Sequence, residues 1–182
     1  LVLDRNETEV NIYRALMQGV TQVRNVRRTF SRLGFGVGHL PNDIFLLVYT
    51  FWYNAHKNRQ LENWSWNDII TNSRDQPSHM YYLPCNLRDR FSDALLVLVS
   101  GWVNSEVRAA HLTREQKEGA KTQGTPLQPV ALETTSLYGI REYSHGARLV
   151  QHVDKVNTHA CSVIVQVGQV GMLEPWPLEI YD

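Results

Sequence analysis

The chain has 182 residues, the length of one domain or of one domain with an appendage. Hydrophobic residues make up 43% and charged residues 20%, the balance of an ordinary globular protein. Lys plus Arg and Asp plus Glu number 18 each, which argues against broad electrostatic binding to nucleic acid or to an anionic membrane. No apolar run reaches the length of about 18 residues that a membrane span needs. Cys85 and Cys161 cannot build a disulfide framework, which fits a reducing compartment.

The first two-thirds of the sequence is predicted to be mainly helical. Apolar residues recur at helical spacing between Glu7 and Phe30, and three glycines and a proline then interrupt the pattern. Pro41 suits the first turn of a second helix. Its predicted apolar face consists of Ile44, Phe45, Leu47, Val48, Phe51, Trp52 and Ala55.

A third helix is predicted to start near Asn86, whose side chain can cap it. Its apolar stripe consists of Leu87, Phe91, Leu95, Leu98, Val99 and Trp102. The stretch before it, ENWSWNDIITNSRDQPSHMYYLPCN, reads as irregular and aromatic. The stretch after it, HLTREQKEGAKTQGTPLQP, is charged and then rich in Gly, Thr and Pro, which indicates a linker or a surface excursion.

After Pro129 the pattern changes to strands. The predicted strands are TSLYGIREY, RLVQHVDK after the turn SHG, ACSVIVQVG and WPLEIYD. In the third, Cys161, Val163, Val165 and Val167 alternate with Ala160, Ser162, Ile164 and Gln166. Four short strands with turn-length connections favour an antiparallel sandwich or barrel with the helices packed outside, an α+β fold.

The stretch REYSHGARLVQHVDK contains the clearest candidate site. Residues i and i+2 of a strand point to the same face, so His152 and Asp154 would project together while Val153 points away. An imidazole and a carboxylate on one face can take neighbouring positions on a borderline divalent metal and leave further positions open. A bare H-x-D is, however, also common as a surface or hydrogen-bonded pair.

The surroundings of this pair form a longer pattern, Tyr143-x-x-Gly146-x-x-Leu149-x-x-His152-x-Asp154, followed by an alternating strand and EPWPLEIYD. Over residues 136–182 the pattern resembles the Fe(II)- and 2-oxoglutarate-dependent oxygenases, most closely their prolyl 4-hydroxylase-like branch. The resemblance implies that residues 130–182 form the first half of a double-stranded β-helix, or jelly-roll. Residues 1–129 would be its mainly helical N-terminal support.

The resemblance also implies roles for single residues. His152 and Asp154 would be two of the iron ligands, and Tyr143 would help to hold 2-oxoglutarate. The implied cofactors are Fe(II), the cosubstrate 2-oxoglutarate and O2, with ascorbate as an optional reductant. The implied reaction hydroxylates an unactivated C–H bond while 2-oxoglutarate is decarboxylated to succinate. A prolyl residue of a protein is the family-level substrate, and other residues or small molecules are the alternatives.

Other residues near the motif are given simpler interpretations. Arg141 and Arg148 are expected to flank the mouth of the barrel and to be solvated, the alternative being contact with a substrate. Trp176 is expected to be a core or rim aromatic residue, the alternative being that it lines the substrate entrance. His145 lies in a turn, and His159 follows Asp154 too soon to return on an opposing strand, so neither is expected to bind the metal.

Two features of the family are missing from this sequence. They are a distal histidine and, beyond it, an Arg or Lys that pairs with the far carboxylate of 2-oxoglutarate. We therefore expect a C-terminally truncated fragment of an oxygenase, without hydroxylase activity on its own. The alternatives are a non-catalytic jelly-roll or cupin-like binding module and a different metal enzyme on the same barrel.

Overall fold

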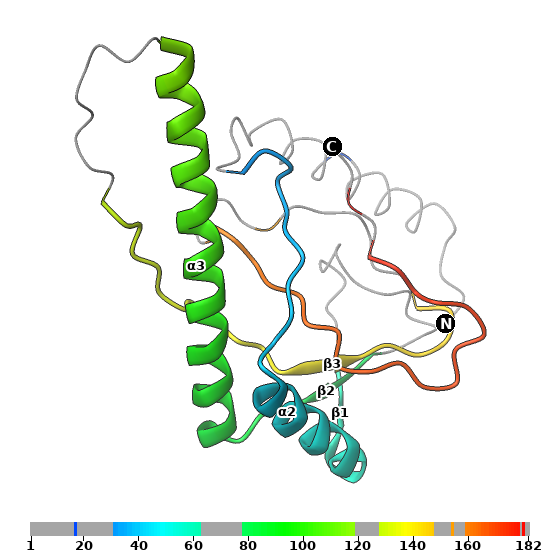
Figure 1. Ribbon diagram of the computed structural model, residues 1–182. Helices are drawn as coiled ribbons and strands as arrows, with labels where there is room; N and C mark the ends of the chain where they lie inside the picture. Colours follow the sequence, from blue (N-terminus) through cyan, green and yellow to red (C-terminus); the bar gives the residue numbers. More distant parts are fainter. Residues whose placement is uncertain are drawn as a thin grey trace.

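The computed structural model describes residues 17, 31–62, 78–118, 128–147, 154, 159–178 and 180. In this part of the chain two helices, α2 (Asn42–Asn54) and α3 (Cys85–Glu118), accompany the short 3-10 helix η1 (His56–Asn58) and a small sheet (Figure 1). This mixture confirms the predicted α+β class, whereas the jelly-roll stays a prediction. Of the predicted first helix, only Met17 is described, and it is helical.

Helix α2 forms where the sequence predicts it. Pro41 precedes it, and the Pro41 carbonyl accepts the first helical bond from the Phe45 N–H at 2.9 Å. Proline suits this place because its φ is already close to helical and its missing N–H would have no partner there. Val48 and Trp52 are buried on one side of the helix. Leu47 is 36% exposed, so the apolar face is narrower than predicted.

Helix α3 starts one residue before the predicted position and runs further than predicted. The Arg88 N–H bonds to the Pro84 carbonyl at 2.8 Å, so Asn86 lies inside the first turn and is not the cap. The helix continues to Glu118, and the prediction of a linker or excursion from His111 is wrong over its first eight residues. The sequence TREQKE supplies good helix formers, whose propensity outweighs the charged composition that suggested a loop.

The sheet has three strands in the order β1 (Gln60–Leu61), β2 (His79–Tyr81) and β3 (Ile140–Glu142), all antiparallel. Strand β3 confirms only the C-terminal part of the predicted strand TSLYGIREY, because residues 135–139 form no strand. Strand β2 lies in the stretch predicted to be irregular, which corrects that prediction. A strand of three residues is too short to show alternation, so pairing with β3 and not local pattern defines it.

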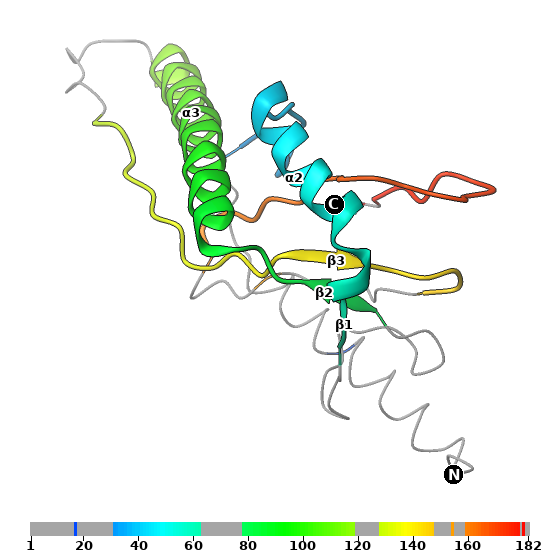
Figure 2. The ribbon, with the colours of Figure 1, turned by 90° about the horizontal axis from the view of Figure 1, so that it is seen from below.

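Among the described residues, a cluster of buried side chains joins the helices to the sheet. Helix α2 lies next to α3 (Figure 2). The members of the cluster are Val48, Trp52, Ala55, Tyr81, Leu83, Phe91 and Ile140. Of the predicted α3 stripe, Leu87, Phe91 and Leu95 pack into or against this cluster, whereas Leu98 is 39% exposed. Each large apolar side chain buried here contributes about 1.5–3 kcal/mol to folding.

Part of the segment of residues 160–170 keeps the predicted alternation without forming a strand. Val165 and Val167 pack against the core cluster while Ile164 is 72% exposed, but Val163, which is predicted to share the face of Val165, is 46% exposed. No strand is assigned over residues 159–178, however, which corrects the prediction for ACSVIVQVG and for the described part of WPLEIYD. A strand requires ladder bonds to a neighbour, and the described chain provides none there.

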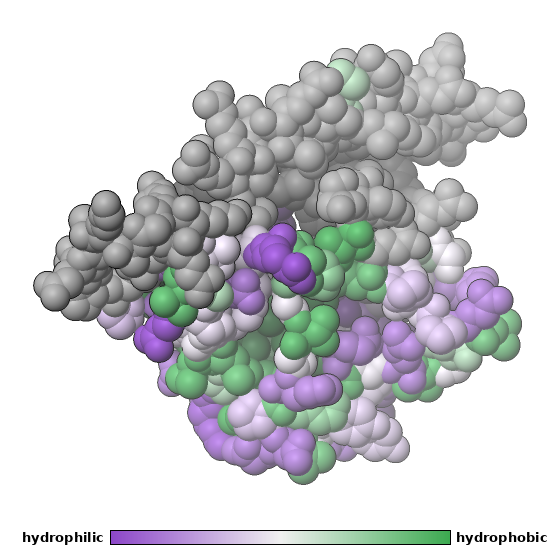
Figure 3. Space-filling view, turned by 45° about the horizontal axis from the view of Figure 1, so that its top comes forward, coloured by the Kyte–Doolittle hydropathy of each residue, from purple (hydrophilic) through white to green (hydrophobic). Residues whose placement is uncertain are grey.

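The face shown in Figure 3 has hydrophobic areas separated by hydrophilic ones. Leu46 and Tyr53 of α2 are 59% and 63% exposed. Within the described ranges, neither helix has the length and apolar character needed to cross a membrane.

Candidate functional site

Tyr143 follows β3 directly and is half-buried. The chain then turns, with the Ala147 N–H bonded to the Ser144 carbonyl at 3.0 Å, as predicted for SHG. Gly146 has a φ of 78°, a left-handed conformation that glycine adopts without the cost of a Cβ. The start of the motif is therefore a strand end followed by a tight turn.

The ring of Tyr143 lies edge-on to the ring of Trp176, with centroids 5.0 Å apart and planes at 86°. Edge-to-face contact is a favoured arrangement of aromatic rings. The contact brings together the two stretches on which the family resemblance rests, REYSHGARLVQHVDK and EPWPLEIYD. Trp176 remains 42% exposed, which fits the expected rim aromatic and not a core residue.

Asp154 is exposed, and its Oδ2 accepts a hydrogen bond from the Ser162 hydroxyl. A hydroxyl bonded to a carboxylate oxygen restricts the orientation of that carboxylate, as outer-shell partners do at metal sites. The other predicted ligand, His152, lies outside the described residues, as does Leu149 of the same motif. The structure therefore places Tyr143 and Asp154 but does not test whether His152 joins them.

The donor types of the motif fit a ferrous ion, because imidazole and carboxylate together suit borderline divalent metals. Among the residues that the structure describes, no group of three or more His, Cys, Asp or Glu side chains is arranged to hold a metal. Asp154 is thus the one predicted ligand whose surroundings are described. His145 and His159 take part in no such group within the described ranges.

Arg141 differs from its predicted solvated state, while Arg148 lies outside the described residues. The Arg141 Nε and Nη2 atoms donate to the two carboxylate oxygens of Glu62 at 2.8 and 3.0 Å. The Ser78 hydroxyl donates to the same carboxylate at 2.6 Å. The Arg141 and Glu62 side chains are only 30% and 12% exposed. Burial alone would lower the pKa of Arg141, but the hydrogen bonds to the Glu62 carboxylate help to hold the pKa above its ordinary value.

The opposite face of the sheet has its own polar cluster around Glu142. The Tyr81 hydroxyl donates to Glu142 Oε2 at 2.6 Å, and Arg59 Nη1 donates to Oε1 at 2.7 Å. Burial and then the Glu142 carboxylate raise the pKa of Tyr81 to about 12. Burial alone would raise the pKa of Glu142, but the Tyr81 bond and the Arg59 charge hold it below its ordinary value.

His56 completes this second cluster, with its Nδ1 atom 3.0 Å from the Tyr81 hydroxyl oxygen. A phenol has one proton, and here it points to Glu142. The His56 Nδ1–H must therefore be the donor to Tyr81, which fixes the tautomer of a neutral His56. Through these bonds Glu142 ties β3 to β2 and to Arg59.

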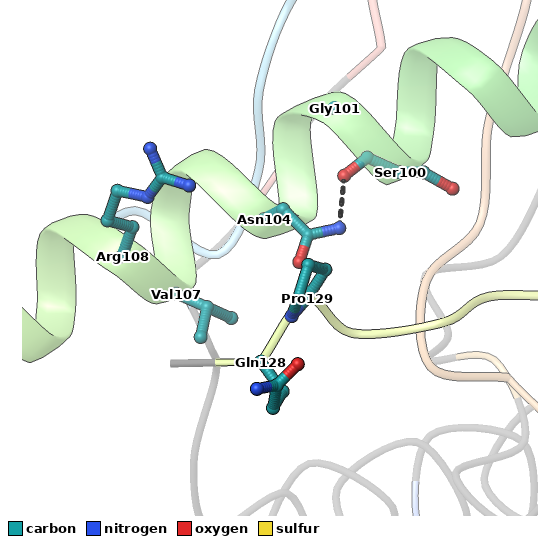
Figure 4. A pocket seen from close by; sticks show the side chains of 7 residues that line it. All are labelled: Ser100, Gly101, Asn104, Val107, Arg108, Gln128 and Pro129. Carbon is teal, nitrogen blue, oxygen red and sulfur yellow. Dashed lines mark hydrogen bonds between the residues drawn. The ribbon is translucent and has the colours of Figure 1, made fainter. Parts of the chain in front are cut away.

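A recess of about 260 Å³ lies between α3 and the segment that leads to β3 (Figure 4). Asn104 is one of the residues that line it. The Asn104 Oδ1 accepts a hydrogen bond from the Val130 N–H at 2.7 Å, and the Asn104 Nδ2 donates one to the Val130 carbonyl at 3.1 Å. Because its amide is used in this way, Asn104 aligns the segment with α3. None of the residues that line the recess belongs to the motif.

Sequence reasoning missed Glu62, Ser78 and Tyr81 as partners of β3, the strand that leads into the motif. Glu62 and Arg141 are 79 positions apart, so no local pattern connects them. The one available signal is that Arg141 and Glu142 are neighbours on a predicted strand, so their side chains point to opposite faces of the sheet. A charged side chain on a half-buried strand requires a polar partner, so each face is expected to supply one.

No model of a known protein family, no curated protein and no solved structure matches this chain.

Proposed function

We propose that this chain carries the opening part of the active site of an Fe(II)- and 2-oxoglutarate-dependent dioxygenase. The observation that supports the proposal is the motif itself, Tyr143-x-x-Gly146-x-x-Leu149-x-x-His152-x-Asp154. Its spacing places an imidazole and a carboxylate two residues apart, after a turn that begins at the end of β3. The contact of Tyr143 with Trp176 adds a spatial link between the two stretches of the pattern.

In this proposal His152 and Asp154 bind the iron, and Ser162 orients the Asp154 carboxylate through its hydrogen bond. The Tyr143 hydroxyl donates a hydrogen bond to a carboxylate of 2-oxoglutarate. The bound iron and cosubstrate supply the activation of O2 that C–H hydroxylation requires. The exposed edge of Trp176 beside Tyr143 gives the substrate an aromatic surface at the rim, and a prolyl residue of a protein is the proposed substrate.

Metal titration tests the ligand assignment independently of turnover. Mn(II), which does not catalyse the oxidation, is titrated calorimetrically into the chain and into any longer natural protein that contains it. His152→Ala and Asp154→Ala should each abolish measurable binding. His159→Ala is the matched control, because it removes a nearby histidine that is not proposed as a ligand.

Equal binding by wild type and both ligand variants, or loss of binding in the His159→Ala control alone, would overturn the assignment. Ser162→Ala provides a graded test. Removing an outer-shell partner of a ligand typically weakens metal binding by about 10- to 100-fold, so Ser162→Ala should bind Mn(II) more weakly than His159→Ala.

A further inference from the structure

A series of aromatic rings leads from the exposed face of α2 to the sheet, and its members are Tyr53, Tyr49, Trp52, His56 and Tyr81. The Tyr53 and Tyr49 rings stack with centroids 6.3 Å apart, and the Tyr49 ring lies 5.5 Å from the Trp52 ring. Helix geometry produces both contacts, because side chains three and four residues apart lie on one face. The exposed fraction falls from 63% for Tyr53 through 37% for Tyr49 to 7% for Trp52. This ring series therefore leads from solvent into the core.

His56 extends the ring series from α2 to β2. Its ring centroid lies 5.9 Å from that of Trp52 and 6.1 Å from that of Tyr81, whose ring it meets edge-on. Trp52 and Tyr81 also belong to the same buried cluster, and Tyr81 is only 1% exposed. Tyrosine and tryptophan rings can each lose one electron, and rings in near contact exchange such electrons by short hops. The spacing along the ring series is therefore suited to electron transfer.

Tyr81 has the hydrogen bonds that oxidation of a phenol requires. A phenol that has lost an electron is a strong acid, so its proton needs an acceptor. The Tyr81 O–H already donates to Glu142 Oε2 at 2.6 Å, and Arg59 orients this carboxylate through its bond to Oε1 at 2.7 Å. The His56 Nδ1–H bonds to the Tyr81 oxygen at 3.0 Å and can stay there after the proton moves. A proton acceptor already in place makes Tyr81 easier to oxidise than a phenol without one.

The protonation state of Tyr81 couples the two transfers. Its pKa is raised to about 12, so the phenol keeps its proton at neutral pH. The electron and the proton must therefore leave together. Since the Tyr81 ring is buried, the radical that results is shielded from reaction with solutes and with other tyrosyl radicals.

We infer that the ring series is an electron-transfer path that connects the exposed Tyr53 to the buried Tyr81. The electron leaves Tyr81 along the rings and passes to a small one-electron oxidant at Tyr53. The O–H bond of Tyr81 breaks, and its proton binds to Glu142 Oε2. The products are the neutral Tyr81 radical, protonated Glu142 and the oxidant reduced by one electron. This activity is independent of the proposed iron site.

Flash photolysis of the full chain tests the path. A ruthenium tris-bipyridine complex, quenched by an irreversible cobalt(III) acceptor, supplies the one-electron oxidant in solution. Electron paramagnetic resonance after freeze-quenching then follows neutral tyrosyl radicals with time. Exposed tyrosyl radicals couple rapidly with one another, whereas a radical on Tyr81 is buried. Wild type should therefore show a slowly decaying tyrosyl signal that outlasts the fast-decaying ones.

Tyr81→Phe should lose the slow signal, and Glu142→Gln should lose most of it because the proton acceptor is gone. Tyr49→Phe should lower the yield of the slow signal, because phenylalanine keeps the ring contacts but does not relay the electron. Tyr138→Phe is the matched control for Tyr49→Phe, since it removes an exposed tyrosine outside the ring series. Circular dichroism establishes that each variant is folded.

An undiminished slow signal in Tyr81→Phe would place the radical elsewhere and overturn the inference. Equal yields in Tyr49→Phe and Tyr138→Phe would show that the electron does not follow α2, which overturns it as well. An undiminished signal in Glu142→Gln contradicts the assigned proton acceptor, and no slow signal in wild type removes the path altogether. Tyr49 is partly exposed, so its substitution spares the core and keeps the test decisive even if Tyr81→Phe does not fold.

Discussion

Tyr143 and Trp176 lie 33 positions apart in the sequence and meet edge to face, with ring centroids 5.0 Å apart. This contact links the end of β3 to the C-terminal segment, which has no ladder bonds in the described chain. It therefore helps to position the C-terminal segment against Tyr143.

Trp176→Leu should destabilise the chain by about 0.5–1.5 kcal/mol, the value of an aromatic pair beyond its buried area. Trp176→Phe is the control, because it retains an aromatic edge for Tyr143. Urea unfolding followed by circular dichroism measures both. Indistinguishable unfolding midpoints for the Leu and Phe variants would show that the ring contact contributes nothing.

Gly139 is required by its backbone conformation and by its surroundings. Its φ is 117°, and a Cβ there would lie 2.5 Å from the Tyr81 carbonyl oxygen. Gly139→Ala should destabilise the fold by about 2–4 kcal/mol because β2 and β3 must separate to admit the methyl group. Gly38→Ala is the control, since a Cβ at Gly38 meets nothing within 4 Å. Thermal melts that show equal losses for both variants would contradict this account of Gly139.

Tyr81 should make stability depend on pH in the alkaline range. Its pKa is raised to about 12 in the folded chain and is about 10 when unfolded, so the folded state holds the proton more tightly. The resulting stability is present below about pH 10 and is lost as the pH rises toward 12. Urea unfolding at a series of pH values should show this loss in wild type.

Tyr81→Phe should remove that alkaline component and cost about 2 kcal/mol at neutral pH, where a hydrogen bond to a charged group is lost. Tyr138→Phe is the control, because Tyr138 is 69% exposed. An unchanged alkaline slope in Tyr81→Phe would show that another group causes it.

Glu142 should make folding stability depend on pH in the acidic range, with stability lost as the pH falls. Its folded pKa is lowered, so its contribution is present above the unfolded pKa of about 4.5 and is lost as the pH falls through the folded value. Glu142→Gln should therefore differ from wild type in thermal stability at pH 7 and converge with it at strongly acidic pH. Exposed Glu174 provides the control substitution Glu174→Gln. A difference between wild type and Glu142→Gln that grows on acidification would contradict the sign of this shift.

Local pattern predicted the elements whose formation depends on local interactions. Helix α2 follows from an apolar face at helical spacing after Pro41, and the turn after Tyr143 follows from Gly146. Helix α3 is longer than predicted because most residues of the stretch TREQKE are good helix formers, although its charged composition suggests a loop. The alternation around Val165 was predicted correctly, but alternation shows an extended backbone and not a partner strand.

The partners in the candidate site could not be predicted in this way. The Glu62–Arg141 pair spans 79 positions and the Tyr81–Glu142 bond spans 61, and both depend on the register of β2 with β3. That register is fixed by a short strand whose sequence has no recognisable pattern. The motif spacing, in contrast, is local, so Tyr143, His152 and Asp154 were identifiable as candidates from the sequence alone.

The central claim is that His152 and Asp154 bind iron beside a 2-oxoglutarate site. The most direct measurement is visible absorption of anaerobic Fe(II) protein during titration with 2-oxoglutarate, on this chain and on any longer natural protein that contains it. The account predicts that the weak charge-transfer band of the iron chelate appears in the natural protein. It predicts loss of the band in His152→Ala and Asp154→Ala and its retention in His159→Ala. No band in the natural protein, or an undiminished band in both ligand variants, would contradict the claim.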